Sequence, residues 1–280
     1  MYEQDLFDEK TWVPPSNLPD LSKEKIISID TETYDPNLLT LGPGWARNDG
    51  RLIGIAVATS NWKAYLPIAH EGGGNLSKSI VLRWLKDQLK HGMSVVFHNA
   101  QYDLGWLSTE GITVPGKVLD TMIAAPLVDE NRFSYSLNAL GYTYLGERKK
   151  EDELKRAASQ HGLDAKKDMW KLPASRVASY AEMDARLTYD LWEVLRQKLV
   201  IENCNKILDL ELSLLPIIFN MRKKGVRVDL DKAEKAKKIL TLKENTLLQE
   251  VKKETGVDSE PWTATSLAKA FDALSLTYER

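Results

Sequence analysis

The sequence predicts an α/β domain with a mixed central sheet flanked by helices, followed by a mostly helical C-terminal segment. Short apolar runs rich in β-branched residues recur up to about residue 120, and such runs predict buried strands. A helical pattern separates the third run from the fourth, and more helical patterns follow, as expected for helices packed on a sheet. Beyond residue 133 helical periodicity dominates.

The strands are expected in chain order at 25–29, 52–59, 62–68 and 93–97, with a short extended piece at 118–122. The second and third are separated by the turn Ser60-Asn61. The segment 34–50 is rich in proline, glycine and asparagine and predicts a loop. Asp120 is expected to begin the helix that follows the last extended piece.

Helices are expected at 77–92, from 98, at 136–145, from Pro173 through Leu195, at 208–223 and at 231–254. Ser77 is a suitable cap for the first, and proline is favoured in a first helical turn. The segment 147–171 is charged and is expected to contain shorter helical pieces.

Composition and charge exclude several classes of protein and several kinds of site. The 280 residues carry a net charge of −2, which predicts that any nucleic-acid contact is short and local. The single cysteine, Cys204, excludes an intrachain disulfide and a cysteine-based zinc site. The N-terminus has no apolar signal segment and no run is long enough to span a membrane, so we expect a cytoplasmic protein.

Asp30 and Glu32 stand at the end of the first apolar run. Side chains alternate along a strand, so both would point to one face, about 7 Å apart. Two crowded carboxylates suit a hard divalent cation such as Mg²⁺ or Mn²⁺. Taken alone, the pair is more often a turn residue and a solvated acid than a metal site, because short acidic pairs are common.

Two further pairs share the spacing of one helical turn. Asn99 and Asp103 are four residues apart, as are Tyr180 and Asp184, so each pair would project from one helix face. Four carboxylates meeting in one cleft can hold two divalent ions roughly 4 Å apart, the arrangement used for phosphoryl displacement.

The chemistry needs no histidine. A phosphodiester is anionic, so attack by hydroxide requires that the negative charge on the attacking and leaving oxygens be neutralised. Tyr180, with an ordinary pKa of about 10, is a poor base at neutral pH and better suited to orienting water. His98 is expected to be a polar neighbour of the cleft, and the other histidines show no ligand spacing.

Three segments resemble the exonuclease motifs of the DEDDy branch of the DnaQ-like 3′–5′ exonucleases, which have an RNase H-like fold. They are Asp30-Thr31-Glu32-Thr33, Asn99-Ala100-Gln101-Tyr102-Asp103 and Tyr180-Ala181-Glu182-Met183-Asp184. The pattern is most similar to the proofreading domain of bacterial and phage family A DNA polymerases. The resemblance covers about residues 25–200.

The resemblance implies a role for each matching residue. The ligands of two Mg²⁺ or Mn²⁺ ions would be Asp30, Glu32, Asp103 and Asp184, with Tyr180 orienting the nucleophilic water. Thr33, Asn99 and Tyr102 match positions that line the substrate cleft. Asp120 fits a position whose role is mainly structural.

One departure affects the contact with the terminal base. Pro36 lies where family members often have an apolar wedge, and Leu38 or Leu39 could take that place. Lys149-Lys150 and Lys166-Lys167 could touch phosphates, although such runs are usually solvated.

The second half also resembles family A polymerases. Residues 210–229 are similar to the junction between exonuclease and polymerase, the lysine-rich helix after it to the start of the thumb, and 262–269 to the next segment. We therefore expect an irregular lead-in at 1–24, an exonuclease domain at 25–203, and the helical start of a polymerase domain at 204–280. No polymerase motif is present in these residues, so no polymerase activity is expected of them.

These features predict a metal-dependent 3′–5′ exonuclease that removes nucleoside 5′-monophosphates from a single-stranded or frayed DNA 3′ end. Its expected setting is proofreading during replication, with a polymerase domain or replication proteins as partners and no membrane. Two alternatives stay open: an RNase D-like 3′–5′ exoribonuclease, which shares the three motifs, and a non-catalytic module that holds 3′ ends.

Overall fold

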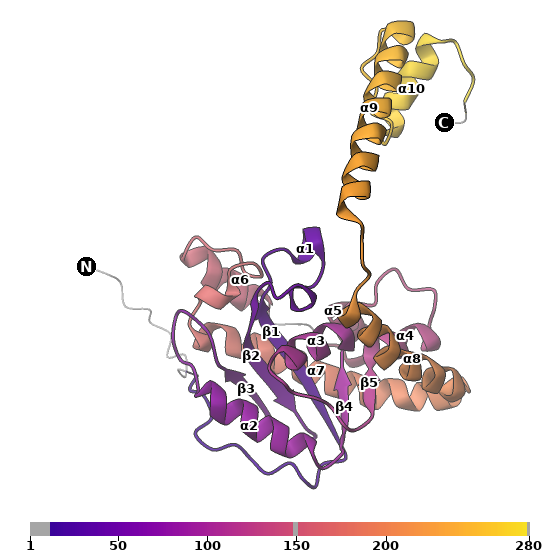
Figure 1. Cartoon of the computed structure of the whole chain (residues 1–280). Helices are drawn as coiled ribbons and strands as arrows, with labels where there is room; N and C mark the ends of the chain where they lie inside the picture. The colour runs from indigo at the N-terminus through magenta and orange to yellow at the C-terminus, as the bar shows by residue number, and fades with distance from the viewer. Residues whose placement is uncertain (1–11, 148–150, 279–280) are drawn as a thin grey trace. The chain divides into compact units, whose positions relative to one another are not determined.

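The computed structural model describes residues 12–147 and 151–278 (Figure 1). The chain divides into two compact units, Met1–Gly225 and Val226–Arg280. None of the described helices is both long and apolar enough to cross a membrane. The Lys149-Lys150 pair and residues 1–11 of the predicted lead-in fall outside the described residues.

A five-stranded mixed sheet forms the centre of the first unit, in the order β3-β2-β1-β4-β5. The strands are β1 (Ile26–Tyr34), β2 (Arg51–Ala58), β3 (Lys63–Pro67), β4 (Ser94–Phe97) and β5 (Val118–Asp120). β1 pairs antiparallel with β2 and parallel with β4, which confirms the predicted mixed sheet.

β1 is longer than predicted, because it continues past the two acids to Tyr34. Asp30 lies opposite Ala56 and Glu32 opposite Gly54 in β2, and the register shifts just after Glu32. The ladder to β2 therefore holds both acids in strand conformation, where the sequence suggested a strand end.

Helices flank the sheet, as Figure 1 shows. In chain order they are α1 (Leu38–Leu41), α2 (Lys78–Leu89), α3 (Ala100–Thr109), α4 (Thr121–Val128), α5 (Leu137–Leu145), α6 (Glu151–Gln160), α7 (Ala174–Ile201) and α8 (Asn205–Lys224). Two short 3-10 turns, η1 (Gly44–Ala46) and η2 (Met169–Lys171), lie in the segments expected to be a loop and a charged region.

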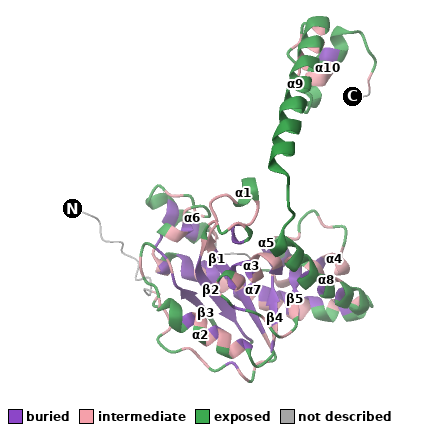
Figure 2. Ribbon diagram, in the orientation of Figure 1, coloured by how far each residue is buried: buried purple, intermediate pink, exposed green. Residues whose placement is uncertain are grey.

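Buried residues follow the strands of the sheet, as Figure 2 shows, and the alternation of side chains along β1 divides the core between the two faces. Ile27 and Ile29 pack with residues of α2 and α3 on one face. On the other face, the small side chains Ala178, Ala181 and Ala185 let α7 lie close against β2. Asp30 and Glu32 alternate with the isoleucines, so they face α7.

α8 belongs to the first compact unit, since Leu208, Leu212 and Leu215 are buried against it. The compact unit thus extends beyond the expected exonuclease range of 25–203. The assignment of 204–280 to the start of a polymerase domain stays a prediction.

The second unit contains α9 (Leu230–Thr255) and α10 (Ala264–Ala273). The Asp229 side chain accepts a hydrogen bond from the Lys232 backbone N–H and so caps α9. Gly256 ends that helix in the left-handed region, with φ 71°. None of the residues of α9 is buried.

Candidate active site

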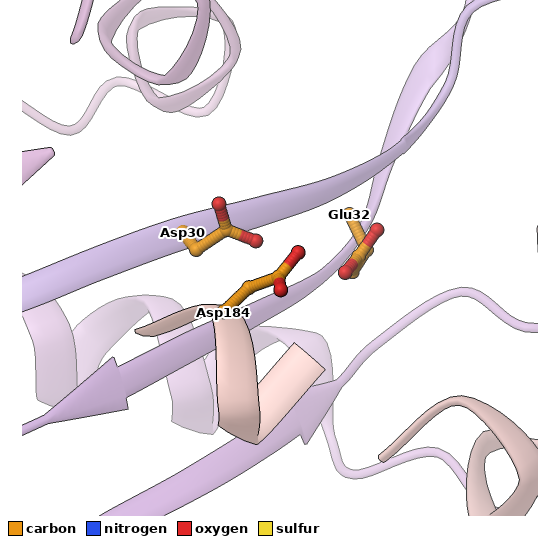
Figure 3. A group of neighbouring side chains, drawn as sticks. All are labelled: Asp30, Glu32 and Asp184. Atoms are coloured by element: carbon orange, nitrogen blue, oxygen red, sulfur yellow. The ribbon is translucent and has the colours of Figure 1, made fainter. Parts of the chain in front are cut away.

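Three carboxylates meet between β1 and α7. Asp30, Glu32 and Asp184 each offer an oxygen, and these oxygens lie within 4.8 Å of one another. Figure 3 shows the three side chains converging from the strand and the helix. Glu32 and Asp184 are buried and Asp30 is half-buried.

The position of Asp184 follows from the packing of α7. The Ser28 hydroxyl on β1 donates a hydrogen bond of 2.7 Å to the backbone carbonyl of Ala185. This contact fixes the position of α7 along β1, and it does so at the residue next to Asp184. The side chain of Asp184 therefore meets the face of β1 that carries Asp30 and Glu32.

The group fits a divalent metal. Three buried or half-buried anions repel one another unless a cation lies between them. Their donor atoms are all carboxylate oxygens, the ligands that Mg²⁺ and Mn²⁺ prefer. The acidic cluster can therefore bind metal, as the sequence predicted.

Asp103, the fourth predicted ligand, takes a different place. It is buried on α3, and its Oδ1 accepts hydrogen bonds from the backbone N–H and the hydroxyl of Thr31, at 2.9 and 2.7 Å. Burial, and then the charge of Asp30, raises its pKa well above the usual range. Asp103 is thus tied to β1 between the two acids of the motif, and its role as a metal ligand stays a prediction.

Tyr180 lies one helical turn before Asp184 on α7, as predicted, and it is buried. Burial raises the pKa of its phenol strongly, and the charges of Asp184, Glu32 and Asp30 add to the effect. The hydroxyl therefore stays protonated over any ordinary pH range. A neutral phenol can both donate and accept hydrogen bonds, so it is suited to orienting a water molecule.

Tyr102 and Thr33 form a polar pair at the side of the cluster. Their hydroxyl oxygens are 2.7 Å apart, and the Tyr102 hydroxyl donates a longer bond, 3.3 Å, to Asp35 Oδ2. Burial raises the pKa of Tyr102 above its ordinary value, so this phenol is also neutral.

Asn99 is the N-cap residue of α3 and adopts a left-handed backbone with φ 72°, which asparagine tolerates. Asp120 holds this turn, since its carboxylate accepts from the backbone N–H groups of Asn99, Ala100 and Met122. This agrees with the structural role expected for Asp120. His98 contacts the Thr121 hydroxyl at 2.9 Å, which fits a polar neighbour of the site.

A cavity of about 590 Å³ opens beside the cluster. All three predicted substrate residues, Thr33, Asn99 and Tyr102, line it together with Glu32 and Tyr180. The volume falls within the range of small-molecule sites, roughly 300–1,000 Å³.

The remaining walls of the cavity combine Leu38 and Lys166, which the sequence offered as possible substrate contacts, with residues that it did not assign to the site. Lys166, Met169 and Arg222 line it, and so does Leu38 on α1. Leu39, the other candidate for an apolar wedge, is 99% exposed. The sequence around Lys166 or Arg222 does not show that either residue lies at a cavity, because only the tertiary fold brings them there.

Comparisons with known proteins agree with this geometry. The model of a family described as 3′–5′ exonuclease, the exonuclease domain of DNA polymerase A, matches residues 17–200. A DNA-directed DNA polymerase of Pseudomonas phage M6 is 36% identical over 275 residues, 95% of this chain and 41% of that protein. DNA polymerase DpoZ of Salmonella phage PMBT28 is 27% identical over 91% of this chain and 39% of its own length.

Solved structures share the fold. NrnC of Brucella melitensis, determined bound to pGG, matches with a TM-score of 0.54 and 21% identity over 74% of this chain and 90% of that one. The POL domain of Pol1 from M. smegmatis, in complex with DNA primer-template and dNTP, matches with a TM-score of 0.57 and 15% identity, over 91% of this chain and 43% of that one.

Proposed function

Because the chain belongs to the 3′–5′ exonuclease family of family A DNA polymerases, we propose that it hydrolyses DNA from the 3′ end. It removes single nucleotides from a single-stranded or frayed end and releases nucleoside 5′-monophosphates. The observation that carries the proposal is the compact group of Asp30, Glu32 and Asp184, beside a cavity lined by Tyr180 and the polar residues of the other two motifs.

In this proposal two divalent ions, Mg²⁺ or Mn²⁺, are held by Asp30, Glu32, Asp103 and Asp184. When bound, such ions neutralise the phosphodiester and lower the pKa of water. The carboxylates would hold this charge beside the cavity, which Glu32 lines. Asp103 supports β1 through Thr31 and so keeps the acids on either side of that residue in position.

The other residues hold the substrate and the water. The Tyr180 hydroxyl orients the attacking water by hydrogen bonding, since burial disfavours the phenolate and raises the pKa of this phenol. Thr33, Asn99 and Tyr102 present hydroxyl and amide groups to the terminal nucleotide. Leu38, on the cavity wall, provides the apolar contact to its base.

The reaction breaks one P–O bond and forms another. The water oxygen adds to phosphorus, and the bond from phosphorus to the 3′-oxygen of the preceding nucleotide breaks. The 3′-oxygen leaves and takes up a proton, and the water loses one. The products are a nucleoside 5′-monophosphate and a strand shortened by one nucleotide with a free 3′-hydroxyl.

The biological setting that we propose is proofreading in DNA replication, with a polymerase domain as partner. The support is that the relatives are named DNA polymerases, and that this chain spans about 41% of the length of the phage M6 protein. The lysine-rich α9 and the unit around it would then lie at the start of the polymerase part.

Degradation of 5′-labelled oligonucleotides tests the proposal. A DNA strand in Mg²⁺ should give a ladder shortened from the 3′ end, and EDTA should abolish it. The double variant Asp30→Ala/Glu32→Ala should lose the activity while keeping its circular dichroism spectrum. Undiminished degradation by this variant would overturn the assignment of the site.

A matched RNA strand tests the choice of substrate in the same assay. Faster degradation of RNA than of DNA would replace the proofreading function with that of an RNase D-like exoribonuclease. Metal binding by calorimetry without turnover of either strand would instead favour a non-catalytic module that holds 3′ ends.

A further inference from the structure

An arginine from outside the family-matched range 17–200 reaches the cavity. Arg222 lies in the last turn of α8 and lines the same cavity as Glu32 and Tyr180. The proposed mechanism gives this residue no role. The question is therefore which group a guanidinium at the cavity wall could bind.

Packing holds the end of α8 at the cavity. Phe219, one turn before Arg222 and on the same helix face, lies with its ring 5.3 Å from the ring of Trp45 in η1. Gly105 on α3 makes room for Trp45, because a Cβ there would lie 2.2 Å from the indole. Trp45 is buried, so the last turn of α8 rests on a built contact with the segment that also carries Pro43 of the cavity wall.

The charge of Arg222 is available for a ligand. Among residues 12–147 and 151–278, no carboxylate forms an ion pair with its guanidinium. Lys166, the other cation that lines the cavity, is paired with Glu151 at 3.5 Å, and its side chain is 69% exposed. An exposed pair of this kind is weak and exchanges readily for another anion.

A helix end commonly carries cations, because they complement the helix dipole. That explanation covers Arg222, Lys223 and Lys224 alike. It does not account for the placement of Arg222 on the cavity wall. A planar guanidinium there matches the geometry of a phosphate, which it can bind through two parallel hydrogen bonds.

We propose that Arg222, with Lys166 as a weaker neighbour, binds the phosphodiester one nucleotide to the 5′ side of the scissile one. The scissile phosphate belongs to the metal-binding carboxylates, none of which is within ion-pair distance of Arg222. The next phosphodiester along the strand is then the anion that Arg222 and Lys166 can bind at the cavity wall. This inference rests on the proposed exonuclease function and adds a subsite that grips the penultimate nucleotide.

Two substrates separate this subsite from the reaction centre. Tetrathymidylate carries phosphodiesters on the 5′ side of the scissile bond, whereas thymidine 5′-(p-nitrophenyl) phosphate has only the bond that is cleaved. Arg222→Ala should raise KM for tetrathymidylate by about fivefold and change kcat by less than about twofold. The dependence of log KM on log salt should become shallower by about 0.7, the value for one lost phosphate contact on a single strand.

Lys223→Ala is the matched control, since it removes the same charge from the same turn without touching the cavity wall. It should leave both substrates unaffected, and Arg222→Lys should give an intermediate KM for tetrathymidylate because it keeps the charge and loses the fork. KM for the single ester should move by less than about twofold in Arg222→Ala.

Three results would overturn the subsite: an unchanged KM in Arg222→Ala, the same rise in Lys223→Ala, or an equal rise for the single ester. No hydrolysis of either substrate by the unaltered chain would count against the proposed function instead. In that case, fluorescence anisotropy of labelled tetrathymidylate in Ca²⁺ decides on the subsite alone. Weaker binding by Arg222→Ala than by Lys223→Ala supports it, and equal binding contradicts it.

Discussion

Thr31 donates two hydrogen bonds to one oxygen of Asp103, 2.9 Å from its backbone nitrogen and 2.7 Å from its hydroxyl. This contact joins the strand that carries Asp30 and Glu32 to the helix that carries the fourth acid. The first two sequence motifs are thus held together by Thr31, which lies between the two acids of the first motif. Its hydroxyl positions the acids, and the acids supply the charge.

Removing that hydroxyl tests the contact. Thr31→Val keeps the shape of the side chain and loses one of the two bonds to a buried carboxylate. We expect the free energy of unfolding to fall by about 1–3 kcal/mol in urea denaturation and kcat to fall by about tenfold. Thr31→Ser, which keeps the hydroxyl, should stay close to the unaltered chain. Equal stability and equal kcat of Thr31→Val and Thr31→Ser would show that the hydroxyl does not position the acids.

Tyr180→Phe tests whether the phenol orients water or takes its proton. Since its pKa is raised far above the ordinary value, we expect kcat to fall by about 10- to 100-fold with a pH profile parallel to that of the unaltered chain. The measurement is kcat from pH 6 to 9 with both proteins. A limb of the profile that disappears with the phenol would show that Tyr180 titrates during catalysis.

His70 makes stability depend on pH. Its Nε2 is 2.6 Å from the Tyr65 hydroxyl and its Nδ1 is 3.0 Å from the Leu172 carbonyl, so the neutral ring fits with its proton on Nδ1. Burial lowers its pKa from 6.5 to about 4. Between these values the unfolded chain binds more protons than the folded one, so stability falls as the pH decreases.

The expected contribution of His70 is about 3 kcal/mol above pH 6.5, lost progressively down to pH 4. His70→Gln can keep both hydrogen bonds without titrating, and it serves as the control. Urea denaturation across this range should show a steeper decline for the unaltered chain than for the variant. Parallel curves would contradict the lowered pKa.

Gly54 faces Glu32 across the ladder from β2 to β1. A Cβ at this position would lie 2.1 Å from the hydroxyl of Tyr65, which is fully buried. Gly54→Ala should therefore destabilise the fold by about 1–3 kcal/mol and lower the activity, because either the Tyr65 ring or the strand that pairs with Glu32 must shift. An unchanged melting temperature of Gly54→Ala would contradict the close contact.

Much of the fold could be predicted from local patterns. Apolar runs placed all five strands, and helical periodicity placed α2, α5, α7, α8 and α9. The continuation of β1 through its acids could not be predicted, because polar residues resemble a strand end until β2 is known to pair with them. The short helix α1 and turn η1 in the expected loop carry no periodic signal.

The candidate site, like the fold, could be predicted from the sequence only in part. The spacing of Tyr180 and Asp184 placed both on one helix face, and the fold brings Asp184 to Asp30 and Glu32. The bonds from Thr31 to Asp103 and the presence of Arg222 at the cavity depend on residues far apart in the chain. No repeat or spacing encodes such contacts, and only the packed structure reveals them.

Hydrolysis of a 5′-labelled DNA oligonucleotide by Asp184→Asn in Mg²⁺ tests whether the three carboxylates form the reaction centre. The amide keeps the shape of the side chain and removes the charge that joins the helix to the acids of the strand. We expect kcat to fall by at least about 10³-fold. Thermal unfolding should occur at or above the temperature of the unaltered chain, because the substitution removes a repulsive charge. Activity within tenfold of the unaltered chain would show that the three carboxylates are not the reaction centre.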